Sequence, residues 1–256
     1  MTISTLLFFI LGIALISYGA NILVASTQNI SEKYDISYFL SSFIFIGLAT
    51  SSPEIIISII SSLDGKPNIA IGNALGSNIA NIALVLALSY LFLTRDTLSL
   101  NKKIDKETYG FILFLIIISL LITPLLADGI FTFNESIVLV TAFIVLMFLY
   151  KKLYYSNDSD NEKTISNKHK SSFQIALAII TGFALLLIGT EVFLANSILI
   201  AKYFGITDYV IGLSITAIGS SIPELASSIE SARKKNIDFI IGNILGSNIF
   251  NFTIVI

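Results

Sequence analysis

The sequence predicts an all-α membrane protein made of two inverted-topology repeats, and three observations carry that prediction. First, 55% of its 256 residues are hydrophobic and only 12% are charged, whereas a soluble domain carries about 25% charged residues. Second, one pattern occurs twice, over 47–81 and 217–251, at a constant offset of 170 residues. Third, the basic residues gather in alternate loops between apolar runs. A fixed offset without a gap is the signature of an internal repeat.

Eight apolar runs are long enough to cross a bilayer as helices, which takes about 20 residues. They cover 2–28, 36–63, 68–93, 108–126, 130–150, 173–203, 209–232 and 239–256. The first run has no basic start and no small-residue cleavage site, so we expect a retained span and not a signal peptide. The chain divides into a first repeat of five spans (1–150), a polar loop (151–171) and a partial second repeat (172–256).

The distribution of basic residues predicts the orientation. With the N-terminus outside, the cytoplasmic loops hold 13 of the 15 basic residues, and the outside keeps Lys66 and Lys202. The 13 are Lys33, Arg95, Lys102, Lys103, Lys106, Lys151, Lys152, Lys163, Lys168, Lys170, Arg233, Lys234 and Lys235. This positive-inside pattern predicts that the N-terminus lies outside and that loop 151–171 lies in the cytoplasm. The membrane that we expect the protein to cross is the plasma membrane. Because five spans per repeat is an odd number, the second copy is inverted, as in many secondary transporters.

The composition disfavours several kinds of site. The chain has no cysteine, and its single histidine, His169, lies in a polar loop, so zinc and copper chemistry find no support. The net charge of −2 gives no reason to expect nucleic acid as a partner. We expect the lipid bilayer as the surrounding partner, no cofactor, and any bound cation to be a hard one held by oxygen.

Two carboxylates lie inside apolar segments at equivalent positions, Glu54 and Glu224. A charged side chain at mid-bilayer costs about 2.5–3.5 kcal/mol on insertion scales. One explanation is a structural hydrogen bond or ion pair, but no Lys or Arg lies inside a predicted span to be the partner. We expect instead that the two acids face each other across the repeat axis. Together they match one divalent or several monovalent cations.

A proline directly precedes each of these acids. Pro53 cannot donate to the carbonyl of Ala49, and Pro223 cannot donate to that of Gly219. Broken backbone is tolerated at membrane depth where it lines a polar cavity, although a simple kink is the alternative. We expect inward carbonyls at 49–50 and 219–220. Hydroxyls three and four residues from the acids share their helix faces: Thr50, Ser51, Ser58, Ser220, Ser221 and Ser228.

The following span of each repeat carries a polar stripe at a spacing of four: Asn73, Ser77 and Asn81, and then Asn243, Ser247 and Asn251. Amide and hydroxyl oxygens are neutral ligands suited to Na⁺ or Ca²⁺; interhelical hydrogen bonding is the alternative. The adjacent small residues should let helices approach closely; they are Gly72, Gly76, Ala80, Gly242 and Gly246.

A further acid, Glu191, lies near the middle of span six, and Asn21 occupies the equivalent position in span one. An intramembrane acid either lines a cavity or is satisfied by neighbouring polar groups. The sequence leaves both interpretations of Glu191 open.

At these positions the sequence resembles the prokaryotic type of sodium/calcium exchanger, within the cation/calcium antiporter group. The matching segments are 49–54 (ATSSPE), 72–73 (GN) and 76–78 (GSN), with 219–224 (GSSIPE), 242–243 (GN) and 246–248 (GSN). The resemblance implies ten helices, so about eight are present and the second repeat is truncated, since 87–150 has no counterpart after Ile256. It also implies that spans one and six slide as a gate.

The resemblance further implies the ion ligands. Glu54 and Glu224 would be the shared carboxylates, completed by carbonyls and hydroxyls of Thr50, Ser51, Ser220, Ser221, Ser77, Ser247, Asn81 and Asn251. The backbone positions Gly47, Ala49, Ala217 and Gly219 belong to the same candidate set. Many family members carry aspartate at one position matching Asn81 or Asn251; asparagine at both leaves the stoichiometry and proton coupling open.

The function expected on these grounds is exchange of Na⁺ for Ca²⁺ by alternating access, in a monomeric transport unit that is not an enzyme. Ca²⁺ and Na⁺ would compete for one carboxylate pair. A proton-coupled antiporter shares the architecture and remains an alternative. A cation channel fits inverted repeats less well, and a scaffold does not explain the buried acids. No Cys or His lies near the acids to complete a nucleophile–base pair.

Overall fold

The computed structural model describes residues 2–93, 106–126, 131–150, 152, 171–207, 211 and 219–256. Every regular element among them is a helix, which confirms the all-α class. Six helices are long and apolar enough to cross a membrane, and a bent pair, 38–50 with 52–63, makes a seventh candidate span. The expected span at 209–232 is described mainly by its second half, and most of loop 151–171 lies outside the described residues.

The helices follow the predicted spans closely. In chain order they are α1 (Ile3–Tyr34), α2 (Tyr38–Ser41), η1 (Ser42–Ile46), α3 (Gly47–Thr50), α4 (Ser52–Leu63), α5 (Pro67–Ala80), η2 (Asn81–Leu86), α6 (Ala87–Leu91), α8 (Lys106–Leu125), α9 (Phe133–Tyr150), α10 (Ser172–Tyr203), α13 (Ile222–Arg233), α14 (Ile237–Phe250) and η5 (Asn251–Val255). Several ends have local causes. Ser171 and Gln174 form a capping box at the start of α10. Pro67 is the first residue of α5, where a backbone N–H would have no partner within the helix, so the missing N–H of proline costs nothing there.

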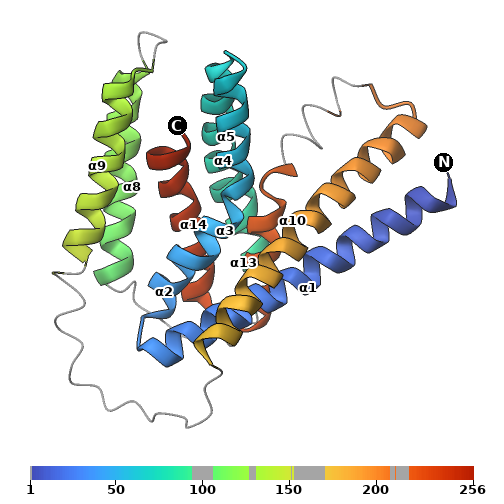
Figure 1. Ribbon diagram of the computed structural model, residues 1–256, viewed down its shortest axis with the longest axis horizontal. Helices are drawn as coiled ribbons and strands as arrows, with labels where there is room; N and C mark the ends of the chain where they lie inside the picture. The colour runs from blue at the N-terminus through green and yellow to red at the C-terminus, as the bar shows by residue number, and fades with distance from the viewer. Residues whose placement is uncertain are drawn as a thin grey trace.

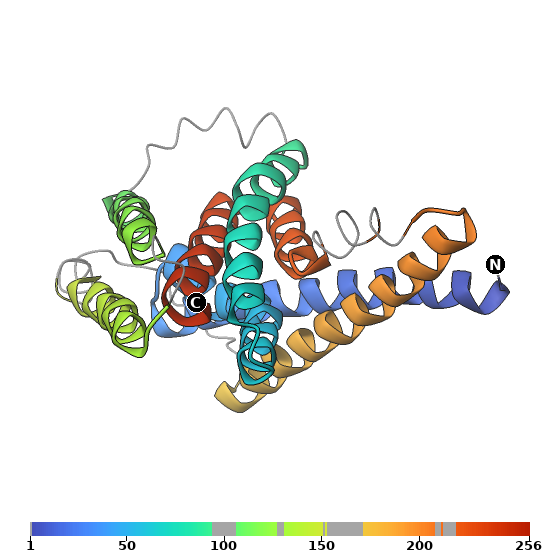
Figure 2. The same ribbon diagram turned by 90° about the horizontal axis from the view of Figure 1, so that it is seen from above.

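The two longest helices, α1 and α10, pack against each other and lean across the other helices (Figures 1 and 2). Their contact is close because glycines meet backbone. A Cβ at Gly12 would lie 2.7 Å from the nitrogen of Phe193, and one at Gly182 would lie 2.8 Å from that of Leu23. These two contacts are equivalent by the repeat, because Gly12 corresponds to Gly182 and Leu23 corresponds to Phe193, each 170 positions away. Gly19 with Leu186 and Gly189 with Ile16 form a second such pair.

These contacts fix the relation between α1 and α10. As residue numbers rise along α1, the numbers of the contacted residues fall along α10 by the same step. The helices are therefore antiparallel, and the exchange of equivalent positions places a pseudo-twofold axis between them. This is the packing that inverted repeats predict.

Helix α14 is the central helix of the described structure, with α2, η1, α3 and α8 against it (Figure 1). Gly242 approaches the carbonyl of Phe39, and a Cβ at Gly246 would lie 2.6 Å from that of Phe43. Phe39, Phe43 and Phe250 form an apolar cluster there with side chains of α8. The small residues of the second repeat thus let helices approach, as predicted.

The small residues of the first repeat make no such approach within the described residues. A Cβ at Gly72 or Gly76 would meet no atom within 4 Å, and both glycines are exposed on α5. The segment equivalent to 39–43, which Gly242 and Gly246 contact, is 209–213; most of it lies outside the described residues, so the prediction for this repeat stays a prediction. Helix α5 packs mainly on α4, η2 and η5, so this face has no neighbour among the described residues.

Candidate ion-binding site

A break in the second span brings Glu54 to the start of a helix. Helix segment 38–50, which ends with α3, and α4 are bent by 43° at Ser51, two residues after the Ala49 carbonyl that Pro53 leaves without a donor. Backbone hydrogen bonds continue across the break from Ser51 to Gly47 and from Ile55 to Ser51, both at 3.1 Å. Glu54 therefore lies in the first turn of α4, where the positive end of the helix dipole favours a carboxylate.

Glu224 lies in the matching position of the second repeat. It occupies the first turn of α13, which also has a proline at its start. Leu225 N–H donates to the carbonyl of Ser221 at 3.0 Å, the counterpart of the Ile55–Ser51 bond. Glu54 and Glu224 are both 0% exposed, so neither side chain faces lipid.

The two carboxylates lie in one electrostatic environment. Glu54 Oε1 accepts a hydrogen bond from Ser77 Oγ at 2.9 Å. The Glu224 carboxylate lies near Glu54 and near the hydroxyls of Thr50 and Ser247, yet neither of its oxygens has a hydrogen-bond partner within the described residues. That the two acids face each other across the repeat axis stays a prediction.

Hydroxyl groups connect the repeats around the acids. Thr50 Oγ1 lies 3.1 Å from Ser247 Oγ, and Ser77 Oγ lies 3.2 Å from Ser220 Oγ. Each pair becomes the other when the repeats are exchanged. The polar stripes of α5 and α14 therefore each meet the residues that precede the acid of the opposite repeat.

Two asparagines are oriented in the same reciprocal manner. Asn81 Nδ2 donates to Asn248 Oδ1, and Asn251 Nδ2 donates to Asn78 Oδ1, both at 3.0 Å. Because the amide nitrogens are engaged, the Oδ1 atoms of Asn81 and Asn251 are left buried without a partner in the described part of the chain. Asn78 and Asn248 had no role in the sequence-based interpretation, although their places in the repeat could have indicated one.

Buried oxygens without partners accumulate around this centre. Buried polar atoms in proteins are nearly always hydrogen-bonded, so such a concentration needs an explanation. Among the described residues they include side-chain oxygens of Ser51, Glu54, Ser58, Asn81, Ser221, Glu224, Ser227 and Asn251. Two carboxylates surrounded by neutral oxygens are a donor set suited to Na⁺ or Ca²⁺.

Other predicted residues have different surroundings. The Gly47 carbonyl already accepts from Ser247 Oγ at 3.3 Å and from the Ser51 amide. Ala49 is half-buried against an apolar cluster with Val24. Gly219 is buried beneath the side chain of Leu194. Ala217 lies outside the described residues.

The remaining polar candidates divide between structure and surface. Asn243 accepts from Thr50 at 3.2 Å and donates to Ser228 at 2.8 Å, which is the interhelical bonding kept as an alternative. Asn73 is half-buried on α5. Glu191 is exposed on α10, so its side chain is not part of the buried oxygen cluster.

Comparison with known proteins agrees with this architecture. The profile of the family "Sodium/calcium exchanger protein" matches residues 4–151 and 174–256. A candidate antiporter of Alkalimonas amylolytica, CaxA, is 31% identical over 263 residues, covering 100% of this chain and 80% of that one. The sodium/calcium exchanger MaX1 of Methanosarcina acetivorans is 26% identical, covering 98% of this chain and 81% of that one.

A solved structure, the sodium/calcium exchanger from Methanococcus jannaschii, superimposes with a TM-score of 0.81 at 28% identity. The match covers 99% of this chain and 80% of that one. The family profile spans most of the sequence, and the helical architecture is shared. The chain therefore belongs to the sodium/calcium exchanger protein family of membrane antiporters.

Proposed function

We propose that this protein exchanges Na⁺ for Ca²⁺ across the membrane by alternating access at the Glu54–Glu224 centre. The observation that carries the proposal is the buried cluster of oxygens without partners around two carboxylates from opposite repeats. The proposed ligands are the two carboxylates with oxygens of Thr50, Ser51, Ser77, Asn81, Ser220, Ser221, Ser247 and Asn251. A monomer is the proposed transport unit, because this centre is built within one chain.

Competition for the same charges explains obligatory exchange. An uncompensated buried charge costs several kcal/mol, so two unneutralised carboxylates oppose a closed, empty centre. Ca²⁺ takes about six to eight oxygen ligands and balances both charges at once. Na⁺ ions occupy the same oxygens and also balance them. One kind of ion therefore leaves as the other enters.

The contacts of α1 and α10 support alternating access. These helices pack on α13 in the second repeat, whereas α4, the counterpart of α13, has no comparable contact with either in the described structure. An exchange of these contacts between the repeats would open one side of the centre and close the other. With the basic end of α13 in the cytoplasm, this arrangement is closed inward and open outward.

The test is Ca²⁺ uptake into liposomes that contain the purified full-length protein. An outward Na⁺ gradient should drive Ca²⁺ uptake, and equal Na⁺ on both sides should not. Glu54→Ala and Glu224→Ala should each abolish the Na⁺-driven flux. Normal flux in either variant would refute the proposed site.

The same preparation distinguishes the other candidates. Uptake driven by a pH gradient without Na⁺ would identify a proton-coupled antiporter. A current that reverses at the Nernst potential of a single ion, whatever the counter-ion, would identify a channel. Either result would contradict Na⁺/Ca²⁺ exchange.

A further inference from the structure

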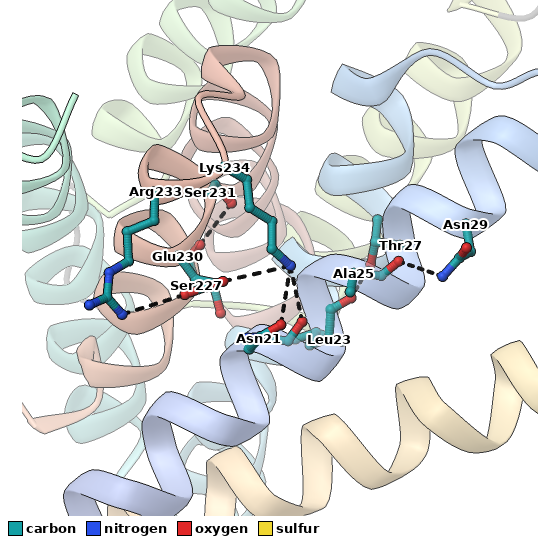
Figure 3. A network of polar contacts seen from close by, with 10 residues as sticks. All are labelled: Asn21, Leu23, Ala25, Thr27, Asn29, Ser227, Glu230, Ser231, Arg233 and Lys234. Carbon is teal, nitrogen blue, oxygen red and sulfur yellow. Dashed lines mark hydrogen bonds and ion pairs between the residues drawn. The ribbon is translucent and has the colours of Figure 1, made fainter. Parts of the chain in front are cut away.

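A lysine at the end of α13 reaches across to α1 (Figure 3). Lys234 Nζ donates to the carbonyl oxygen and to the side-chain Oδ1 of Asn21, both at 3.3 Å. It also pairs with Glu230 at 3.6 Å, with side chains 25% and 12% exposed respectively. Burial lowers the pKa of Lys234, and Glu230 partly offsets this. The ammonium group is thus partly withdrawn from water at the contact between α1 and α13.

The apolar packing around this contact is incomplete. A pocket of about 270 Å³ lies between α1, α10 and α13, lined mainly by apolar side chains, with Glu230 and Arg233 among its lining residues. Unfilled space between helices forfeits dispersion contacts. The contact of Lys234 with Asn21 lies beside this pocket, whose lining includes the neighbouring residues Ala20 and Arg233.

The repeat offset identifies the equivalent contact in the other half. Lys234 corresponds to Asp64 and Asn21 to Glu191, each 170 residues away. Asp64 and Glu191 are both exposed, and neither makes a side-chain hydrogen bond or ion pair within the described residues. If α10 packed on α4 as α1 packs on α13, the carboxylates of Asp64 and Glu191 would lie next to each other, in the places that Lys234 and Asn21 occupy in the contact between α1 and α13. Like charges so placed repel each other.

We propose that Lys234 is a positioning residue for transport, which holds α1 on α13 and favours the state closed on that side. The opposite state lacks this contact and brings Asp64 and Glu191 together. The state with α1 on α13 and the state with α10 on α4 therefore differ in free energy. The difference comes from four side chains outside the ion-binding centre: Lys234, Asn21, Asp64 and Glu191. This inference rests on the proposed alternation of access, and it gives Glu191 a role that the sequence left open.

The first test compares Lys234→Gln with Lys235→Gln. Both remove one positive charge from the same turn, but Lys235 is exposed, and the bonds to Asn21 on α1 come from Lys234. The chain has no cysteine, so spin labels can be attached at Leu199→Cys on α10 and Leu63→Cys on α4, both exposed. Pulsed EPR distances then report the approach of α10 to α4.

Lys234→Gln should raise the ratio of the short-distance to the long-distance population about fivefold, the scale of a modest coupling. Lys235→Gln should leave that ratio unchanged. If the wild type and Lys234→Gln show two populations in the same ratio, the role of Lys234 is refuted while alternating access stands. If every variant shows one distance only, the proposed alternation fails as well.

A second variant tests the assignment without loosening any contact. Asp64→Lys combined with Glu191→Asn recreates the Lys234–Asn21 pair in the other repeat. It should also shift the population toward the short distance, which a merely destabilised helix would not do. An unchanged distance distribution in this double variant would overturn the inference.

Discussion

Helices α5 and α14 carry the same polar stripe but have different surroundings. In the most apolar stretch of the segment Ile237–Val255, 72% of residues are buried, against 33% for Pro67–Leu91. Gly242 and Gly246 lie against backbone, whereas a Cβ at Gly72 or Gly76 would meet no atom of the described residues within 4 Å. Nevertheless Ser77, Asn81, Ser247 and Asn251 are all buried.

The difference between α5 and α14 separates two properties of a repeated helix: which side chains share a face, and which faces are buried. The spacing within a helix fixes which side chains share a face, so both copies present the same oxygens to the centre. The burial of the opposite face depends on neighbouring helices, and among the described residues these are not the same for the two copies. The oxygen atoms are therefore repeated in both copies, although the described packing is not.

The largest expected effect tests that chemical symmetry. Glu54→Gln and Glu224→Gln should each weaken Ca²⁺ binding on the order of a hundredfold or more, because removing one partner of a buried charged set costs about 3–5 kcal/mol. Isothermal titration calorimetry of the purified variants measures this. Glu135→Gln, at the start of α9, where Glu135 bonds Thr132, is the control. A large loss in one variant with little in the other would break the symmetry.

A second prediction tests the asymmetry of packing. Gly246→Ala should lower the free energy of unfolding by about 1–3 kcal/mol, because its Cβ would overlap the carbonyl of Phe43. The matched change Gly76→Ala should be neutral or stabilising by up to about 1 kcal/mol, since alanine favours helix and the space is open. Thermal unfolding in detergent compares the two variants. Equal losses would show that α5 packs as tightly as α14.

The smallest effect concerns the asparagines that orient ligands. Asn78→Ala and Asn248→Ala each remove the acceptor that engages Asn251 or Asn81. One hydrogen bond contributes about 1 kcal/mol, so each variant should weaken Ca²⁺ binding about fivefold. The same calorimetric titration measures the loss. Unchanged affinity in both variants would mean that the amide orientation does not matter for binding.

Much of the fold and of the candidate site follows from sequence alone. Apolar runs predict helices within a few residues, as for α10, expected over 173–203 and observed over Ser172–Tyr203. The offset of 170 residues is enough to pair Glu54 with Glu224. Proline before each acid predicts a broken helix, which the 43° bend at Ser51 confirms for the first repeat.

What the sequence does not predict depends on contacts between distant segments. Gly72 and Gly242 are in similar local contexts, AIGNALG and IIGNILG, yet among the described residues only Gly242 meets another backbone. The orientation of Asn81 depends on Asn248, 167 residues away. The Lys234–Asn21 contact depends on how α1 leans on α13, which no local pattern encodes. Local spacing determines faces, but partners are decided by tertiary packing.

The central claim is that two twofold-related acids form one cation centre that Ca²⁺ and Na⁺ occupy in turn. Equilibrium binding of radioactive Ca²⁺ to the purified protein, titrated with Na⁺, tests it most directly. The account predicts that Na⁺ displaces the bound Ca²⁺ fully and with a steep, multi-ion dependence. Ca²⁺ that stays bound at saturating Na⁺, with both carboxylates intact, would contradict it.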